Sequence, residues 1–217
     1  ILTLFFMKKL LQAFKVRSFL LLWLGELFTQ ISINLLNFFL IFLVFSLTAS
    51  NTAVSWLVIS ITIPAILFGL IAGVYVDRWE KKRVLYFANI VRAVLLIILA
   101  LLHTNLLIIF TVAALVSLLT QFFIPAESPL IPEIVEPELL YSANALFSIG
   151  IYGSMLIAYL LSGPALLYLQ NYQILMALAV ALIIGAFFIS LIKLPKEKRS
   201  RRPLEVKRDA IREVKSV

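Results

Sequence analysis

Four polar side chains lie at helical spacing inside one long apolar run. Glu26, Gln30, Asn34 and Asn37 are separated by four, four and three residues within residues 19–47. At 3.6 residues per turn these positions fall in one stripe of a helix. Unsatisfied polar groups that face lipid cost several kcal/mol, so the stripe must face protein or water. It is either a hydrogen-bonded seam between helices or the wall of a substrate cavity, and four polar residues over three turns favour the cavity.

Other apolar runs carry weaker signals of the same kind. Ser and Thr hydroxyls often bond only to their own helix, so packing is the better explanation for most of these polar positions. Three positions remain candidates for the wall of the same cavity: Gln121, Asn144 and Tyr152.

Glu26 and Arg92 are the only charges well inside the apolar runs. Each lies roughly 12 Å from the start of its helix at a rise of about 1.5 Å per residue, so an ion pair between the two helices is possible. An unpaired charge at the centre of a bilayer costs about 2.5–3.5 kcal/mol on insertion scales, and a partner would reduce this cost. For Glu26, structural pairing and a proton-titrating role both stay open, whereas for Arg92 we expect a structural role.

Membrane-spanning helices must position these residues. Of the 217 residues, 63% are hydrophobic and only 14% are charged, far from the balance of a soluble domain. Six apolar runs reach the roughly 20 residues that cross a hydrocarbon core. They cover residues 19–47, 53–76, 84–102, 106–124, 143–169 and 172–194. The sequence therefore predicts an all-α integral membrane protein with a six-transmembrane-helix bundle over residues 19–194, after an N-terminal segment 1–18 and before a basic segment 195–217.

Charge placement orients the bundle. Apart from Arg92, every Lys and Arg lies in the clusters 8–17, 78–83 and 193–215. This is the positive-inside pattern and not a nucleic-acid-binding face, so both ends of the chain and the loop 78–83 should be cytoplasmic. The links at Ser50, His103 and Gln170 should then face outward. The link 125–142 should face inward, although it carries Glu127 and three other glutamates and no cation. Its four prolines indicate that it does not simply continue either neighbouring helix.

The stretch from Gly73 to Leu85 joins the second and third apolar runs. Gly69 and Gly73 form a small-xxx-small pattern, which is typical of closely packed helices. Asp77 follows at the negative end of the helix dipole, which is unfavourable unless a cation or the positive end of another helix lies opposite.

This stretch resembles the loop between helices two and three of the major facilitator superfamily, with the pattern G-x-L-A-D-R-x-G-R-K-x-x-L. Gly73, Asp77, Arg78, Lys82 and Leu85 match the pattern, whereas Glu80 replaces its second Gly and Lys81 its Arg. Residues 122–126, 131–133, 142–146 and 89–92 are similar to the branch that holds macrolide-efflux and enterobactin-exporter-like proteins.

The resemblance implies the N-terminal six-helix half of a twelve-helix fold, built from two inverted three-helix repeats. It implies a secondary transporter that exports a drug, macrolide or siderophore-like molecule across the bacterial inner membrane by alternating access. Its partners would be that small-molecule substrate, the lipid bilayer and the C-terminal six-helix half of the same polypeptide. A cytoplasmic gating loop would comprise Gly73, Asp77, Arg78, Lys81, Lys82 and Arg83, and Asp77 would contact the other half.

Enzymatic chemistry is not indicated. The sequence contains no phosphate-binding loop, no H-E-x-x-H motif, no G-x-S-x-G motif and no cysteine, which argues against an intramembrane enzyme and excludes Cys-ligated metals. No cofactor is expected, although a proton or another ion could couple transport. Two alternatives stay open: a self-sufficient six-helix channel or dimeric transporter, and a non-transporting membrane assembly partner.

Overall fold

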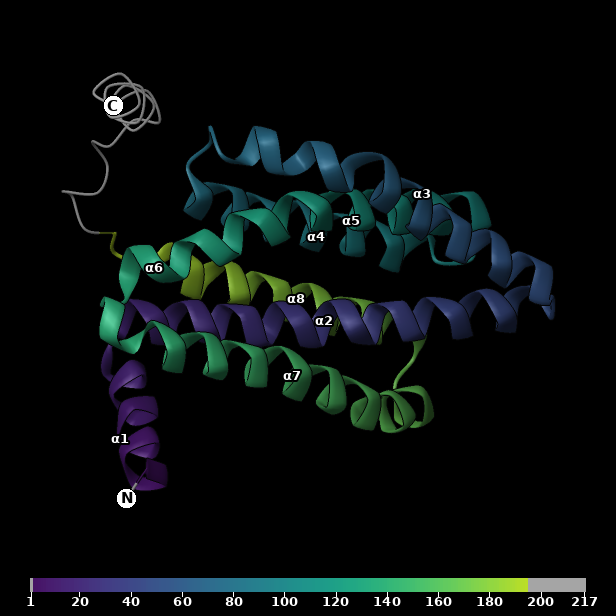
Figure 1. Cartoon of the computed structure of the whole chain (residues 1–217). Helices are drawn as coiled ribbons and strands as arrows, with labels where there is room; N and C mark the ends of the chain where they lie inside the picture. The colour runs from purple at the N-terminus through teal and green to yellow at the C-terminus, as the bar shows by residue number, and fades with distance from the viewer. Residues whose placement is uncertain (1, 195–217) are drawn as a thin grey trace.

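The computed structural model describes residues 2–194, apart from the side chains of residues 2–8 and of Leu70. The predicted basic segment 195–217 therefore lies outside the described residues. Within them every regular element is helical, and Figure 1 shows long helices running side by side along one axis.

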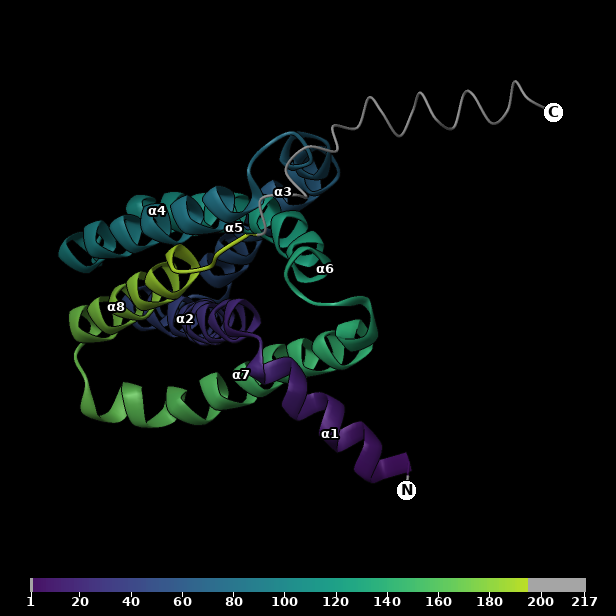
Figure 2. The same ribbon diagram turned by 90° about the vertical axis from the view of Figure 1, so that its left-hand side faces the viewer.

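Six long helices form the bundle and confirm the six predicted apolar runs. They are α2 (Arg17–Thr48), α3 (Asn51–Val76), α4 (Lys81–Leu102), α5 (Leu106–Glu127), α7 (Leu140–Tyr168) and α8 (Asn171–Ser190). Each contains a stretch that is long and apolar enough to cross a membrane. A first helix, α1 (Leu2–Lys15), precedes them and projects away from the bundle axis (Figures 1 and 2).

Polar side chains at the three predicted outward links begin the helices that follow. The Ser50 hydroxyl accepts the Ala53 amide at the start of α3. The Asn105 side chain accepts two amides at the start of α5, and Gln170 forms a capping box with Gln173 at the start of α8. Since a helix N-terminus leaves amides without partners, these residues define where α3, α5 and α8 begin.

The helices pack in pairs that follow an internal symmetry. The first three spans, α2, α3 and α4, correspond in order to the last three, α5, α7 and α8. Helix α3 packs on α5, and its counterpart α7 packs on α2. Helix α4 also packs on α5, and its counterpart α8 packs on α2. The central pair is α4 with α8, and Figure 2 shows α2 between α7 and α8. This is the pattern expected when two three-helix repeats are related by a twofold axis.

Helices α2 and α8 approach each other closely where Gly25 faces Gly185. A Cβ built on Gly185 would lie 2.9 Å from the Gly25 carbonyl oxygen, so only glycine fits there at this helix separation. Close packing was also predicted at Gly69 and Gly73. A Cβ on Gly69 would lie 3.5 Å from Gln121 Oε1 of α5, an ordinary contact, whereas a Cβ on Gly73 has no described atom within 4 Å.

The chain between α5 and α7 differs from the prediction of a link over residues 125–142. Helix α5 continues through Pro125 to Glu127, since transmembrane helices tolerate an internal proline when neighbours satisfy the freed backbone groups. Three short helices follow: η1 (Ser128–Leu130), α6 (Ile131–Ile134) and η2 (Pro137–Leu139). Glu127 is consequently the last residue of α5 and is buried, with 5% exposure, rather than part of a solvated link.

One end of the bundle collects the basic residues. The α3–α4 loop, α1, α6 and residues 191–194 after α8 all lie there (Figure 1). We call it the basic end, and the other the opposite end.

Candidate functional site

The predicted polar stripe runs along α2 from the interior to an exposed face. Glu26 is buried at 2% exposure, Gln30 and Asn34 are half-buried and Asn37 is exposed. The Gln30 side-chain amide donates to Glu26 Oε1 at 2.6 Å, and the Asn34 amide donates to the Gln30 carbonyl oxygen at 2.8 Å.

These hydrogen bonds join residues of α2 to one another. No hydrogen bond links Gln30 or Asn34 to another helix within the described part of the chain, so the stripe does not act there as a seam between helices. The seams are made elsewhere, by Ser32 to the Leu178 carbonyl and by Trp23 to the Leu146 carbonyl. The stripe therefore keeps polar groups for water or a bound molecule, as a cavity wall requires.

Arg92 lies at the centre of a second polar group, which joins three helices. One terminal nitrogen donates to Asn89 Oδ1 at 3.1 Å, and the other donates to Thr120 Oγ1 on α5 at 2.9 Å. Asn89 in turn donates to Thr29 Oγ1 on α2 at 2.7 Å. The guanidinium also lies over the Phe123 ring, 4.8 Å from its centroid, a favourable cation–π geometry.

The predicted ion pair between Glu26 and Arg92 is not formed as a direct contact. Neither of the ion pairs among the described residues includes these two side chains. The Arg92 charge nevertheless acts through space on the carboxylates of both Glu26 and Glu127. Arg92 is 1% exposed, and its neutral hydrogen-bond partners support the structural role that the sequence suggested.

Glu127 is the member of this site that the sequence did not indicate. Its side chain is buried at 5% exposure, as is that of Glu26 at 2%. Three buried atoms of this group have no hydrogen-bond partner in the described structure: Glu26 Oε2, Glu127 Oε1 and Arg92 Nε. Two acids and one base thus meet in the interior where α2, α4 and α5 converge, and we call Glu26, Glu127 and Arg92 the charged triad.

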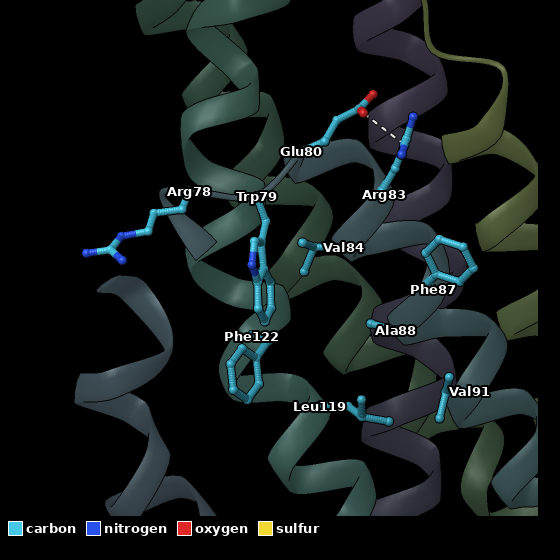
Figure 3. Close-up of a pocket in the computed structure, with 10 residues that line it drawn as sticks. All are labelled: Arg78, Trp79, Glu80, Arg83, Val84, Phe87, Ala88, Val91, Leu119 and Phe122. Carbon is cyan, nitrogen blue, oxygen red and sulfur yellow. Dashed lines mark ion pairs between the residues drawn. The ribbon is translucent and has the colours of Figure 1, made fainter. Parts of the chain in front are cut away.

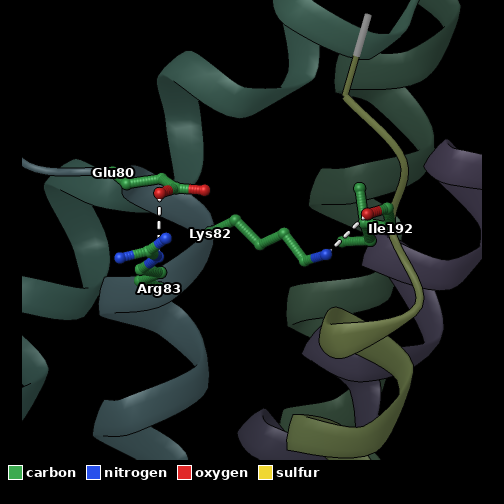
Figure 4. A network of polar contacts seen from close by, with 4 residues as sticks. All are labelled: Glu80, Lys82, Arg83 and Ile192. Carbon is green, nitrogen blue, oxygen red and sulfur yellow. Dashed lines mark hydrogen bonds and ion pairs between the residues drawn. The ribbon is translucent and has the colours of Figure 1, made fainter.

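The predicted gating loop divides into residues with and without partners in this chain. Lys81 forms an ion pair with Glu133 of α6 at 3.4 Å. Lys82 donates to the Ile192 carbonyl just beyond α8 at 2.7 Å, and Arg83 pairs with Glu80 at 2.8 Å (Figure 4). A cation near a helix C-terminus is favourable, so Lys82 stabilises the end of α8.

Asp77 and Arg78 are exposed at the end of α3. Neither makes a side-chain hydrogen bond or ion pair with the described residues. Gly73, the first residue of the motif, is half-buried one turn earlier.

Beside the loop, a groove lies between α4 and α5. It has a volume of about 680 Å³, and Figure 3 shows Trp79 and Phe122 on one side and Phe87 and Val91 on the other. The Trp79 and Phe122 rings stack with centroids 6.0 Å apart. Arg78 lines the same groove at the end of α3.

The other candidate cavity residues make no hydrogen bond with the charged triad in the described structure. Gln121 is half-buried on α5 and donates to the Ser117 carbonyl. Asn144 and Tyr152 are exposed on α7, and Tyr152 is 68% exposed. Among the described residues no group of three or more His, Cys, Asp or Glu side chains could hold a metal ion.

Comparison with known proteins identifies the family of this chain. The family model described as Major Facilitator Superfamily matches residues 22–217. A Bacillus subtilis protein described as "Uncharacterized MFS-type transporter YkuC" is 30% identical over 201 residues, which cover 86% of this chain and 44% of the relative. The chain thus spans less than half the length of that relative. Members of this family are membrane transporters rather than enzymes, and the six spans form the six-helix bundle of one half of its fold. The chain belongs to the major facilitator superfamily.

Proposed function

We propose that this chain is the N-terminal half of a secondary active exporter in the bacterial inner membrane. Its substrate would be a small molecule of the drug, macrolide or siderophore-like kind. The family supports membrane transport, and the outward direction is supported by the resemblance of residues 122–126 and 142–146 to an exporter-containing branch. The 44% coverage of the relative supports a second half in the same polypeptide.

The basic end would face the cytoplasm. Arg78 of the α3–α4 loop, the three cations that begin α4 and the cations at residues 8–17 belong to this end. Such clusters are retained on the cytoplasmic side of bacterial membranes. The short links after α2, α4 and α7 would then face outward.

The polar stripe of α2 would form part of the substrate cavity. The observation that carries this proposal is that Gln30 and Asn34 bond only within α2 and lead to the exposed Asn37. In a protein embedded in lipid, exposed polar groups at this depth require a water-filled or ligand-filled space. Alternating access would open this space to each side of the membrane in turn.

The substrate-cavity proposal is tested by Asn34→Leu in the full-length protein. We expect export of the transported compound to fall at least tenfold, because an apolar side chain removes a polar contact from the cavity wall, while the amount of protein in the membrane stays the same. Thr62→Val is the matched control, since Thr62 is exposed on α3 and bonds only to its own helix. The assay is efflux of dye, macrolide and siderophore compounds across a pH gradient. Unchanged export by Asn34→Leu would remove the stripe from the substrate path.

The exposed Asp77 would contact the second half of the transporter and hold the cytoplasmic ends of the two halves together in the outward-open state. The free carboxylate at the end of α3 supports this role, because it needs a cation or the N-terminus of another helix opposite. Asp77→Asn should impair export and leave expression intact. Asp77→Glu, which keeps the charge, is the control. If Asp77→Asn exports normally, the charge has no part in holding the halves together.

A further inference from the structure

The groove between α4 and α5 changes in chemistry along its length. Its charged lining residues, Arg78, Glu80 and Arg83, all lie at the basic end, and the rest of its lining is aromatic or aliphatic. We propose that this groove binds one anionic phospholipid, with the headgroup phosphate at the two arginines and an acyl chain along the apolar part. The proposal rests on insertion of the six spans in a membrane and not on the direction of transport.

The apolar part of the groove extends along the spans. Val91 lies eight residues after Arg83 on α4, which is about 12 Å at the helical rise of 1.5 Å per residue. Figure 3 shows Val91 and Leu119 at the far end of the groove from Arg83. Phe87 is 58% exposed and Val91 is 43% exposed, so no described helix covers this wall. An occupant must therefore be apolar over this length, as an acyl chain is and a free phosphate is not.

The groove is a defined site at the depth where headgroups meet hydrocarbon. The Trp79 and Phe122 rings stack along one wall with centroids 6.0 Å apart. Trp79 is 49% exposed, and tryptophan is enriched at this level of a membrane. The volume of about 680 Å³ falls within the range of sites that hold small molecules, about 300–1,000 Å³. The groove can therefore hold part of one lipid in a fixed place.

The charges at the basic end of the groove favour an anion. Arg83 pairs with Glu80 through Nε at 2.8 Å, and its side chain stays 69% exposed. Arg78 is exposed and makes no ion pair with the described residues, and Asp77 does not line the groove. Two arginines and one glutamate leave one net positive charge, which balances the single negative charge of a phosphodiester. Arginine is also suited to phosphate oxygens, because its donors form a planar fork.

The position of the groove favours an anionic lipid over a zwitterionic one. The basic end is the end proposed to face the cytoplasm, where anionic lipids attract cations close to the membrane. Basic pockets between transmembrane helices on that side hold anionic headgroups such as that of cardiolipin. A zwitterionic headgroup would bring its own cation toward the arginines and would gain less from them. We therefore expect phosphatidylglycerol or cardiolipin to be preferred over phosphatidylcholine.

Quenching of Trp79 by brominated lipids tests the site in the full-length protein. The protein is placed in phosphatidylcholine vesicles with a small fraction of either brominated phosphatidylglycerol or brominated phosphatidylcholine. The difference in fluorescence between wild type and Trp79→Phe isolates Trp79 from the other tryptophans. At equal fractions we expect the anionic lipid to be preferred about fivefold at Trp79, the effect of one net charge near a membrane surface.

Charge variants separate the groove from general attraction to the basic end. Arg83→Gln should abolish the preference, because Arg78 and Glu80 alone leave no net charge in the groove. Arg78→Gln should act in the same way. Arg17→Gln is the matched control, since Arg17 is exposed at the start of α2 and does not line the groove, and it should keep the preference. Thermal unfolding shows whether each variant is folded.

Equal quenching of Trp79 by the two brominated lipids in the wild type would overturn the proposal. Trp79 quenched by neither lipid would show that another part of the full-length protein covers the groove, which would also overturn it. A preference lost on adding inorganic phosphate at constant ionic strength would assign the arginines to a free anion instead. The measurement needs no transported compound, so a protein that shows the preference but exports nothing would refute only the proposed function.

Discussion

Replacing Gly185 by alanine tests how tightly α2 and α8 must pack to build the polar interior. The new Cβ would lie 2.9 Å from the Gly25 carbonyl oxygen, 3.0 Å from Thr29 Oγ1 and 3.3 Å from Asn89 Nδ2. The first of these is backbone, which no rotamer change can move away. The two helices must therefore separate, or the hydrogen bond between Asn89 and Thr29 must lengthen.

Gly153→Ala is the matched control for this substitution. Both glycines lie inside long helices, but a Cβ on Gly153 has no described atom within 4 Å. Both changes gain the same helix propensity of about 1 kcal/mol, so this contribution cancels when the variants are compared. Overpacking costs about 1–3 kcal/mol, and Gly185→Ala should be the less stable of the two by that amount.

Thermal unfolding in detergent, followed by tryptophan fluorescence, measures the difference. Soluble domains of this size lose about 2–4 °C in Tm per kcal/mol, so the two variants should separate by several degrees. Export should also fall in Gly185→Ala, because Asn89 links the Thr29 hydroxyl of α2 to Arg92 of α4. Equal Tm values for the two variants would refute the view that the Gly25–Gly185 contact determines the helix separation.

Two further contacts give predictions that separate bonds between elements from bonds within one helix. Lys82→Ala should destabilise the end of α8 by about 1–2 kcal/mol, because the Ile192 carbonyl loses a charged donor. Hydrogen exchange at the amides after α8 should become faster, and an unchanged exchange rate would contradict this role of Lys82. Ser117→Ala removes the bond from α5 to the Ile61 carbonyl of α3 and should cost about 0.6–1.5 kcal/mol. The Ser60 hydroxyl bonds only to its own helix, so Ser60→Ala should leave Tm unchanged. An equal decrease in Tm in both serine variants would show that the bond from Ser117 to α3 contributes nothing to stability.

The spans could be predicted from the sequence because hydropathy and helix capping are local properties. A run of about 20 apolar residues identifies a span wherever it packs, and Ser50, Asn105 and Gln170 begin helices through amides only two or three residues away. The helical spacing of Glu26, Gln30 and Asn34 likewise predicted their common stripe, since that spacing is independent of the rest of the fold.

What could not be predicted depends on contacts between distant residues. Gly25 and Gly185 are far apart in the chain, and the small-residue pattern at Gly69 and Gly73 marked a different helix. Glu127 was assigned to a link because Pro125 and later prolines suggested that the helix had ended. The structure keeps α5 helical through Pro125, which carries the side chain of Glu127 into the interior. The signal available in the sequence was that Glu127 follows an apolar run without interruption.

The gating loop shows how one short motif can serve both the half-bundle and its proposed partner half. The cations nearest α4 are satisfied within this chain: Lys81 by Glu133 and Lys82 by the end of α8. These contacts join the start of α4 to α6 and to the chain just beyond α8. Asp77 has no such contact, although its carboxylate lies at the unfavourable end of the α3 dipole. The Asp77 carboxylate is therefore suited to a contact with the second half that forms and breaks during transport. Breaking that contact would remove no hydrogen bond or ion pair that Asp77 makes with the described residues of its own half. The free energy of closing the cytoplasmic side would then depend on the contact between Asp77 and the second half. Lys81 and Lys82 would instead hold the start of α4, and with it the loop that carries Asp77, in position.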